Sequence, residues 1–173
     1  TGERAIITTW GKPNHQEVGE GIHLKIPIAQ KAIKMDVKIQ KYETDLTAAS
    51  KDLQDVKTKA AINYQLMATK ASEIYQNVGI DYADTIIYPA EQEANKGVTA
   101  QYTAEELVTR REDVRAKMRE ILSVKLEPYG IIVTDINIID FQFSNAFSTA
   151  IEQKVTADQL RFKAESDLVR IGL

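Results

Sequence analysis

The chain has 173 residues, of which 43% are hydrophobic and 27% are charged, a composition typical of a folded domain with a sizeable core. Its formal net charge of −3 gives no electrostatic support for nucleic-acid binding, and the absence of cysteine excludes disulfides, thiolate chemistry and cysteine-based metal sites. The apolar runs are far shorter than the roughly 18 residues that a membrane-spanning helix needs.

The charge is unevenly distributed along the chain. Residues 1–41 hold seven Lys and Arg against four Asp and Glu, whereas the remainder holds fifteen against twenty-one. The basic first part suits a position near anionic lipid headgroups, but scattered solvated lysines on strand faces explain it equally well. Because the chain begins at Thr1 rather than Met, we expect it to be part of a longer protein.

The first 67 residues are predicted to be rich in strands. Apolar and polar residues alternate along residues 22–28, 33–39 and 56–66. A period of two is typical of antiparallel strands with one buried and one solvated face. The polar residues 50–52 are predicted to form the turn before the third of these strands.

The period changes to that of helices near residue 69. Apolar residues between 71 and 78 predict a short helix that ends at Gly79. A second helical segment is expected to kink or start afresh at Pro89, because proline fits only the first turn of a helix. Its predicted apolar face consists of Tyr82, Ile86, Ala90 and Ala94.

A third helical segment begins with a capping box formed by Thr103 and Glu106. The pairs Glu106–Arg110 and Asp113–Lys117 have the spacing of favourable surface ion pairs. The helical segment is predicted to end at residues 128–130, where Gly130 follows Pro128 and Tyr129. The predicted buried stripe consists of Leu107, Val114, Met118, Ile121, Leu122 and Leu126.

Residues 131–143 are rich in β-branched and aromatic side chains and are predicted to form a returning strand. The apolar phase shifts between Ile138 and Ile139, which indicates either a bulge or burial on both faces. Ser144 is the predicted N-cap of a long last helix. Strands followed by helices with one returning strand predict an α+β fold.

The last helix needs a surface on which its apolar residues can pack. That surface is either the core of its own domain or another chain. We expect Phe147 to Val155 to pack on the sheet and the residues beyond to start an intermolecular coiled coil. The predicted oligomer interface consists of Leu160, Phe162, Ala164 and Leu168.

No recognisable catalytic constellation is present. His15 and His23 lie in the strand-rich part without carboxylates at metal-ligand spacing, and Gly19 and Gly21 precede a strand rather than a helix. We therefore predict no enzymatic activity, no cofactor and no metal; the rival hypothesis is a hydrolase with an unrecognised site. Trp10, the single tryptophan, fits either a core position or an interfacial membrane anchor.

Collinear motifs along nearly the whole chain resemble those of the prohibitin/stomatin (SPFH or PHB domain) family, with prohibitin the closer branch. These motifs are GERAII at residues 2–7, VGEGIHLKIP at 18–27, SKDLQDV at 50–56, GIDYADTIIYP at 79–89, YTAEELVTRRE at 102–112 and FQFSNAFSTAIEQK at 141–154.

The resemblance implies a non-enzymatic, membrane-associated scaffold that forms ring- or cage-like homo-oligomers. It also implies membrane lipids and a membrane-anchored AAA protease as partners, and an anchor upstream of Thr1. The alternative is a soluble adaptor that binds a protease or channel without lipid contact. The implied domain covers residues 1–155, strand-rich over 1–67 and α/β over 68–155, and residues 156–173 start the coiled coil. The predicted membrane-proximal residues are Trp10, Ile26, Pro27 and Ile28.

Overall fold

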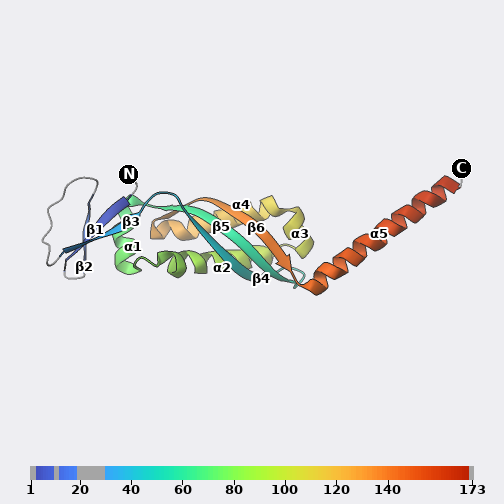
Figure 1. Cartoon of the computed structure of the whole chain (residues 1–173), viewed down its shortest axis with the longest axis horizontal. Coiled ribbons are helices and arrows are strands. Elements are labelled where there is room, and N and C mark those ends of the chain that lie inside the picture. The colour runs from blue at the N-terminus through green and yellow to red at the C-terminus, as the bar shows by residue number, and fades with distance from the viewer. Residues whose placement is uncertain (1–2, 10–11, 19–29, 172–173) are drawn as a thin grey trace.

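The computed structural model describes residues 3–9, 12–18 and 30–171, and among them the side chains of residues 3–7 and 33–166. These residues form an elongated body of two antiparallel sheets and a helical layer, from which one long helix projects (Figure 1). The strands are β1 (Glu3–Thr9), β2 (Lys12–Val18), β3 (Gln30–Asp36), β4 (Gln40–Ala49), β5 (Asp55–Leu66) and β6 (Ile131–Phe143). The helices are α1 (Ala71–Asn77), α2 (Tyr88–Thr99), α3 (Ala104–Thr109), α4 (Arg111–Leu126) and α5 (Asn145–Ile171), with short turns η1 (Ala68–Lys70), η2 (Ala83–Ile87) and η3 (Glu127–Tyr129).

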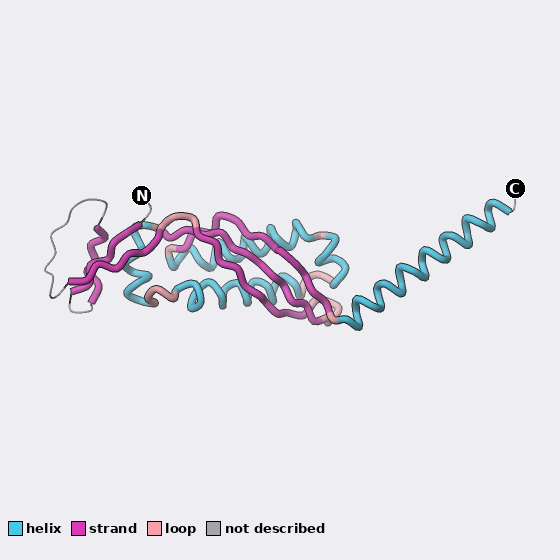
Figure 2. Tube along the Cα trace, viewed as in Figure 1, coloured by secondary structure: helices cyan, strands magenta, loops and turns pink. Residues whose placement is uncertain are grey.

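The predicted α+β class is confirmed. The first sheet has the strand order β2-β1-β3 and the second has the order β4-β5-β6, with antiparallel pairing throughout. The second sheet crosses over the helical layer in Figure 2. Strand β4 was not among the predicted strands. Its exposed and less exposed positions alternate, but Leu46 is its one fully buried side chain, so few apolar residues mark the pattern in the sequence. The predicted strand over residues 22–28 lies outside the described residues.

Of the two alternatives that the sequence left open for the returning strand, the structure shows the bulge. Asp140 pairs with Lys59 and Ile138 pairs with Ala60, so Ile139 is the extra residue on β6. The guanidinium of Arg111 donates hydrogen bonds to the carbonyls of Ile138 and Ile139, the latter at 2.8 Å. The first residue of α4 is thereby fastened to the irregular part of the sheet.

The helical layer begins and ends where the sequence predicts. Thr103 and Glu106 form the capping box, and Gly79 and Gly130 adopt the left-handed conformations that end helical segments. The third segment differs in one respect, because it breaks at Arg110 into α3 and α4.

The break at Arg110 changes the surface ion pairs that the sequence predicts. Arg110 Nη2 pairs with Asp113 Oδ2 at 2.9 Å, rather than with Glu106, because residues 106 and 110 no longer lie within one regular helix. Lys117 Nζ donates to Gln101 Oε1 at 3.1 Å, which puts a neutral partner where Asp113 was expected.

Helix α2 restarts near Pro89 as predicted, but its buried face differs from the predicted one. The π-helical turn η2 precedes α2 and adds a residue to the helical repeat. Tyr82, which precedes this turn, is buried as predicted. From this turn onward the buried positions of the helix are shifted by one residue, so Ile86 and Ala90 are only partly buried. The buried residues of η2 and α2 are Ile87, Glu91, Ala94, Asn95, Val98 and Thr99.

The main core lies between the second sheet and helices α2 and α4. Val114, Met118, Leu122 and Leu126 of α4 are completely buried, as predicted. The sheet contributes side chains from the inward faces of β4, β5 and β6, including Leu46, Val56, Ala60, Ile62, Ile131 and Ile136.

Helix α5 differs from the expectation that its residues as far as Val155 pack on the sheet. Phe147 is partly buried, but Ile151 is 36% exposed and Val155 is 48% exposed. The inner face of the sheet is already covered by α2 and α4, so the helix that starts after Ser144 projects from the end of the body (Figure 1). The boundary at residue 155 stays a prediction.

Candidate assembly surface

Helix α5 is held to the body at its first turn. Ser144 Oγ accepts a hydrogen bond from the Phe147 backbone N–H at 3.2 Å, which confirms the predicted N-cap. The ring of Phe147 also contacts that of Phe143 at the end of β6, with centroids 5.4 Å apart. The helix is 27 residues long in total and extends away from the body.

The predicted interface residues lie along the projecting part of α5. Leu160 is 63% exposed and Phe162 is 77% exposed, and Ala164 is also exposed. The side chain of Leu168 lies outside the described ones. The role of these residues in assembly stays a prediction.

The helical geometry divides this predicted interface into two stripes. Successive residues of an α-helix are rotated by about 100°, so Leu160 and Phe162 are about 160° apart around the axis and point to opposite sides. Ala164 lies on the side of Leu160, whereas Ile151 and Val155 lie on the side of Phe162. We call these the Leu160 stripe (Leu160, Ala164) and the Phe162 stripe (Ile151, Val155, Phe162).

The Phe162 stripe continues into an apolar notch at the root of α5. The notch has a volume of ≈ 490 Å³ and lies between α3 and the first turns of α5. Glu105, Glu152 and Lys154 are among its polar lining residues. Its apolar lining consists of Ala104, Val108, Phe143, Phe147, Ile151 and Val155.

Helix α3, one wall of the notch, is fixed by a group of polar contacts. Thr103 Oγ1 accepts from the Glu106 N–H at 3.2 Å, and Glu106 Oε2 accepts from the Thr103 N–H at 2.9 Å, which keeps the pKa of Glu106 below its ordinary value. Asp52 Oδ1 accepts from the Ser50 hydroxyl at 2.6 Å and from the Ala104 N–H at 2.9 Å. These bonds, that of Ser50 first, lower the pKa of Asp52 and join the β4–β5 turn to α3.

Two exposed apolar side chains near this end were not predicted. Val108 is 57% exposed, although its neighbour Leu107 is completely buried. A rotation of about 100° between the two residues was the available signal, since it turns Val108 away from the core. Leu53 is 84% exposed and has a φ of 59°, a conformation that the sequence of the turn does not indicate.

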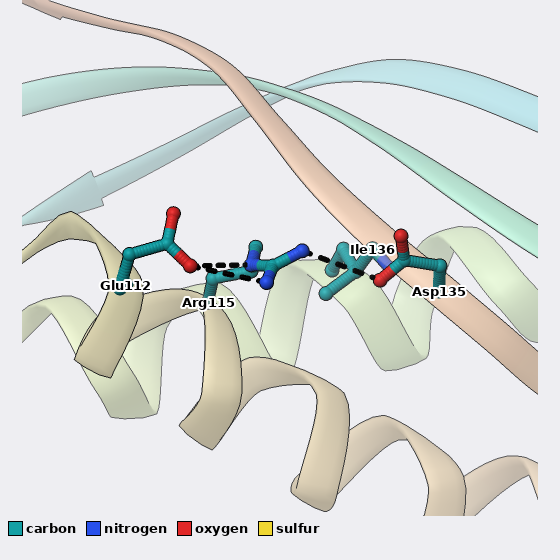
Figure 3. Close-up of polar contacts among 4 residues, drawn as sticks. All are labelled: Glu112, Arg115, Asp135 and Ile136. Atoms are coloured by element: carbon teal, nitrogen blue, oxygen red, sulfur yellow. Dashed lines mark hydrogen bonds and ion pairs between the residues drawn. The ribbon is translucent and has the colours of Figure 1, made fainter.

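A polar cluster connects α4 to β6. Arg115 pairs with Glu112 Oε2 at 3.0 Å and with Asp135 Oδ1 at 3.5 Å, and Asp135 Oδ1 also accepts from the Ile136 N–H at 2.8 Å (Figure 3). Each charged group is matched by an opposite charge or a backbone donor. The cluster therefore holds α4 to β6 and is a structural contact.

Residues 3–9, 12–18 and 30–171 contain no group of three or more His, Asp or Glu side chains placed to hold a metal ion. Within the same residues, no helix combines the length and the apolarity needed to cross a membrane. The predicted membrane-proximal residues Trp10, Ile26, Pro27 and Ile28 lie outside the described residues.

Comparison with known proteins assigns residues 1–170 to the model of the SPFH domain / Band 7 family. The chain is 38% identical to Prohibitin-1 of Schizosaccharomyces pombe over 159 residues, covering 91% of this chain and 56% of that protein. It is 35% identical to Prohibitin-1 of Saccharomyces cerevisiae, covering 83% and 50%, and 33% identical to the Mitochondrial prohibitin complex protein 1 of Caenorhabditis elegans, covering 94% and 60%. The chain thus spans about half the length of these relatives.

Proposed function

The chain belongs to the SPFH domain / Band 7 family of membrane scaffolds, and from this membership we propose that it assembles with further copies of itself through α5 at a membrane surface. The observation that carries the proposal is the exposure of large apolar side chains, Leu160 at 63% and Phe162 at 77%, on a helix that projects from the body. The names of the relatives support an assembly, since one of them is called a prohibitin complex protein.

Burial of these side chains supplies the driving force for association. Removing a Leu or Phe side chain from water is worth about 1.5–3 kcal/mol, and a single helix in water gains little stability from its propensity alone. Packing against the α5 of another copy would bury the Leu160 stripe or the Phe162 stripe and would support the helix. Leu160, Phe162, Ala164 and Leu168 remain the proposed contact residues.

The positions of the two stripes favour an arrangement in which every copy has two neighbours. A helix with a single apolar face is satisfied by one partner, as in a two-fold dimer. The Leu160 stripe and the Phe162 stripe point to opposite sides, so one neighbour would leave one stripe exposed. Contacts between unlike faces generate a ring when the rotation closes, which is the ring- or cage-like assembly that we propose.

The membrane is the proposed surface on which this assembly forms. Support comes from the family, from relatives named mitochondrial prohibitins and from the excess of Lys and Arg over residues 1–41. Trp10, Ile26, Pro27 and Ile28 are the proposed contacts with lipid, and a segment upstream of Thr1 is the proposed anchor. We further propose that the assembled scaffold organises lipids and contacts a membrane-anchored AAA protease.

Light scattering of the chain tests the assembly proposal. The mass of the wild-type chain should rise with concentration, and Leu160→Asp or Phe162→Asp should reduce that rise, because each places a charge in an apolar contact. Arg161→Asp is the matched control, since Arg161 is exposed and lies about 100° around the helix from both Leu160 and Phe162. A wild-type chain that stays monomeric at high concentration would contradict assembly through α5.

Flotation with anionic liposomes tests the membrane proposal separately. The wild-type chain should float, and the combined variant Trp10→Ser, Ile26→Ser and Ile28→Ser should float less because it loses apolar contact with the interface. The Leu160→Asp variant serves as the control for an indirect effect of assembly. If neither the chain nor a version extended by the upstream segment of a relative floats, the membrane proposal is wrong.

A further inference from the structure

Buried polar side chains lie in the core between α2 and the second sheet. Glu91 and Asn95 have no exposed surface, and Thr58 is 1% exposed. Both carboxyl oxygens of Glu91, both amide atoms of Asn95 and the hydroxyl of Thr58 lack a hydrogen-bond partner among the described residues. Buried polar groups are normally paired, so this group requires a physical explanation.

Contacts on the outer side of α2 show how the helix lies on the sheet. The amide of Gln92 binds the edge of β4, donating to the Thr47 carbonyl at 2.7 Å and accepting from the Thr47 N–H at 3.3 Å. Tyr42, earlier on β4, donates to Asp84 in η2 at 2.6 Å. Helix α2 therefore runs in the same direction as β4. Gln92 lies on the outer side of the helix, and the residue before it, Glu91, is turned inward.

The three polar residues lie on the two surfaces that meet at this interface. Glu91 and Asn95 are four residues apart, so they are neighbours on one face of α2. Thr58 lies on the inward face of β5, directly opposite Leu46 of β4. The interface thus contains a carboxyl, an amide and a hydroxyl that lack partners among the described residues.

The groups that face Glu91 do not include a cation among the described residues. The buried side chains of α4 are Val114, Met118, Leu122 and Leu126, and those of β5 are apolar except for Thr58 and the Tyr64 hydroxyl, which bonds Tyr82. On β4, Tyr42 is the ionisable group that senses Glu91; its pKa is raised by burial first and then by Asp84, with a smaller contribution from Glu91. Lys125 of α4 reaches α2 on the exposed side only, where it pairs with Glu93 at 2.6 Å.

We propose that Glu91, Asn95 and Thr58 form a proton-binding site between α2 and the sheet, and that release of the proton loosens α2 from the sheet. A protonated carboxyl is both a donor and an acceptor, so it can pair with an amide or a hydroxyl within the core. An ionised carboxylate only accepts, and a charge without a cation or water is costly in an apolar interior. Burial accordingly raises the pKa of Glu91 to about 8.

The surroundings of α2 allow such a movement. The π-helical turn η2 comes directly before the helix, and π-helical turns interrupt the regular hydrogen-bond ladder. The contacts of α2 through Gln92 and Glu93 are on the exposed side, where water replaces a broken hydrogen bond or ion pair. Movement of α2 away from β4 would bring the Glu91 carboxylate into water.

Hydrogen exchange of the α2 amides as a function of pH tests the proposal. If Glu91 regains its ordinary pKa of 4.5 in the open form, the protection factors of these amides should fall about a hundredfold between pH 6 and pH 9. Glu91→Gln keeps the shape and removes the titration, so its protection factors should change little over this range. Glu93→Gln removes a carboxylate from the exposed side of the same helix and should retain the wild-type pH dependence.

A carbon NMR titration of the glutamate carboxyls gives a second readout that does not depend on helix opening. The carboxyl of Glu91 should be protonated at pH 6 and should titrate well above the other glutamates. An ionised Glu91 at pH 6 would overturn the proposal. The proposal is also wrong if α2 protection is independent of pH in the wild-type chain, or depends on pH equally in Glu91→Gln.

Discussion

Gly130 occupies the point where the helical layer turns back into the sheet. It has a φ of +79°, and a Cβ added there would lie 2.7 Å from Lys70 Cβ. Its N–H donates to the Glu127 carbonyl and its carbonyl accepts from the Met67 N–H, both at 2.8 Å. The backbone at Gly130 is therefore fixed from both sides and cannot shift to accept a side chain.

Replacement of Gly130 by alanine should lower the free energy of unfolding by about 2–3 kcal/mol, through backbone strain and the clash with Lys70. Urea denaturation measures the change. Gly97→Ala is the matched control: Gly97 lies within α2 with nothing within 4 Å of an added Cβ, so alanine there should stabilise by up to about 1 kcal/mol. Equal effects at the two positions would show that the left-handed conformation of Gly130 is not needed.

The buried carboxyl of Glu91 should make the stability of the whole body depend on pH. Its pKa is about 8 in the folded chain and 4.5 when solvated, so the folded state holds its proton more tightly. The contribution of Glu91 to the free energy of unfolding is therefore fully present below pH 4.5, and it is lost progressively as the pH rises to about 8.

Glu91→Gln should therefore be increasingly more stable than the wild-type chain as the pH rises. Between pH 5 and pH 9 the difference in the free energy of unfolding should grow by at most about 4 kcal/mol. Denaturant titrations of the two proteins at matched pH values measure it, and groups other than Glu91 cancel in the comparison. A constant difference across this range would mean that Glu91 does not titrate abnormally.

At the scale of elements, α4 is the helix that seals the core against the sheet. Leu122 is completely buried, whereas Val124, two residues away, is 70% exposed. Leu122→Ala should lower the free energy of unfolding by about 2–5 kcal/mol, because it removes buried apolar atoms and leaves a cavity. Val124→Ala should change it by less than about 0.5 kcal/mol. Comparable losses at both positions would contradict the packing of α4.

The sequence predicted elements whose signals are local. The capping box at Thr103 and the stop at Gly130 depend on a few neighbouring residues, and the structure confirms both. The phase shift at Ile139 is equally local, and of its two predicted causes the structure shows the bulge. The phase of α2 could not be predicted, because the π-helical turn before it shifts the repeat by one residue. That shift also concealed the buried position of Glu91, which follows Ile87 by four residues.

At the scale of the whole molecule, the sequence indicated the α+β class and the family but not the direction of α5. Phe147 to Val155 have the spacing of a buried face, yet that spacing cannot tell a core of the same chain from that of a neighbour. The structure gives the inner face of the sheet to α2 and α4 and leaves Ile151 and Val155 partly exposed. Likewise, the predicted interface residues fall into two stripes because the structure shows one continuous helix over residues 145–171, which fixes the angle between Leu160 and Phe162.

Chemical cross-linking through introduced cysteines tests assembly through both stripes of α5 most directly. The sequence has no cysteine, so Leu160→Cys and Phe162→Cys introduce the only thiols. With a flexible bismaleimide, each single variant should give dimers at most, and the double variant should give a ladder of larger species, because each copy then reacts on both sides. Val124→Cys with Arg161→Cys is the control pair, because both residues are exposed and neither lies on a stripe. A double variant that yields no more multimers than this control would contradict assembly through α5.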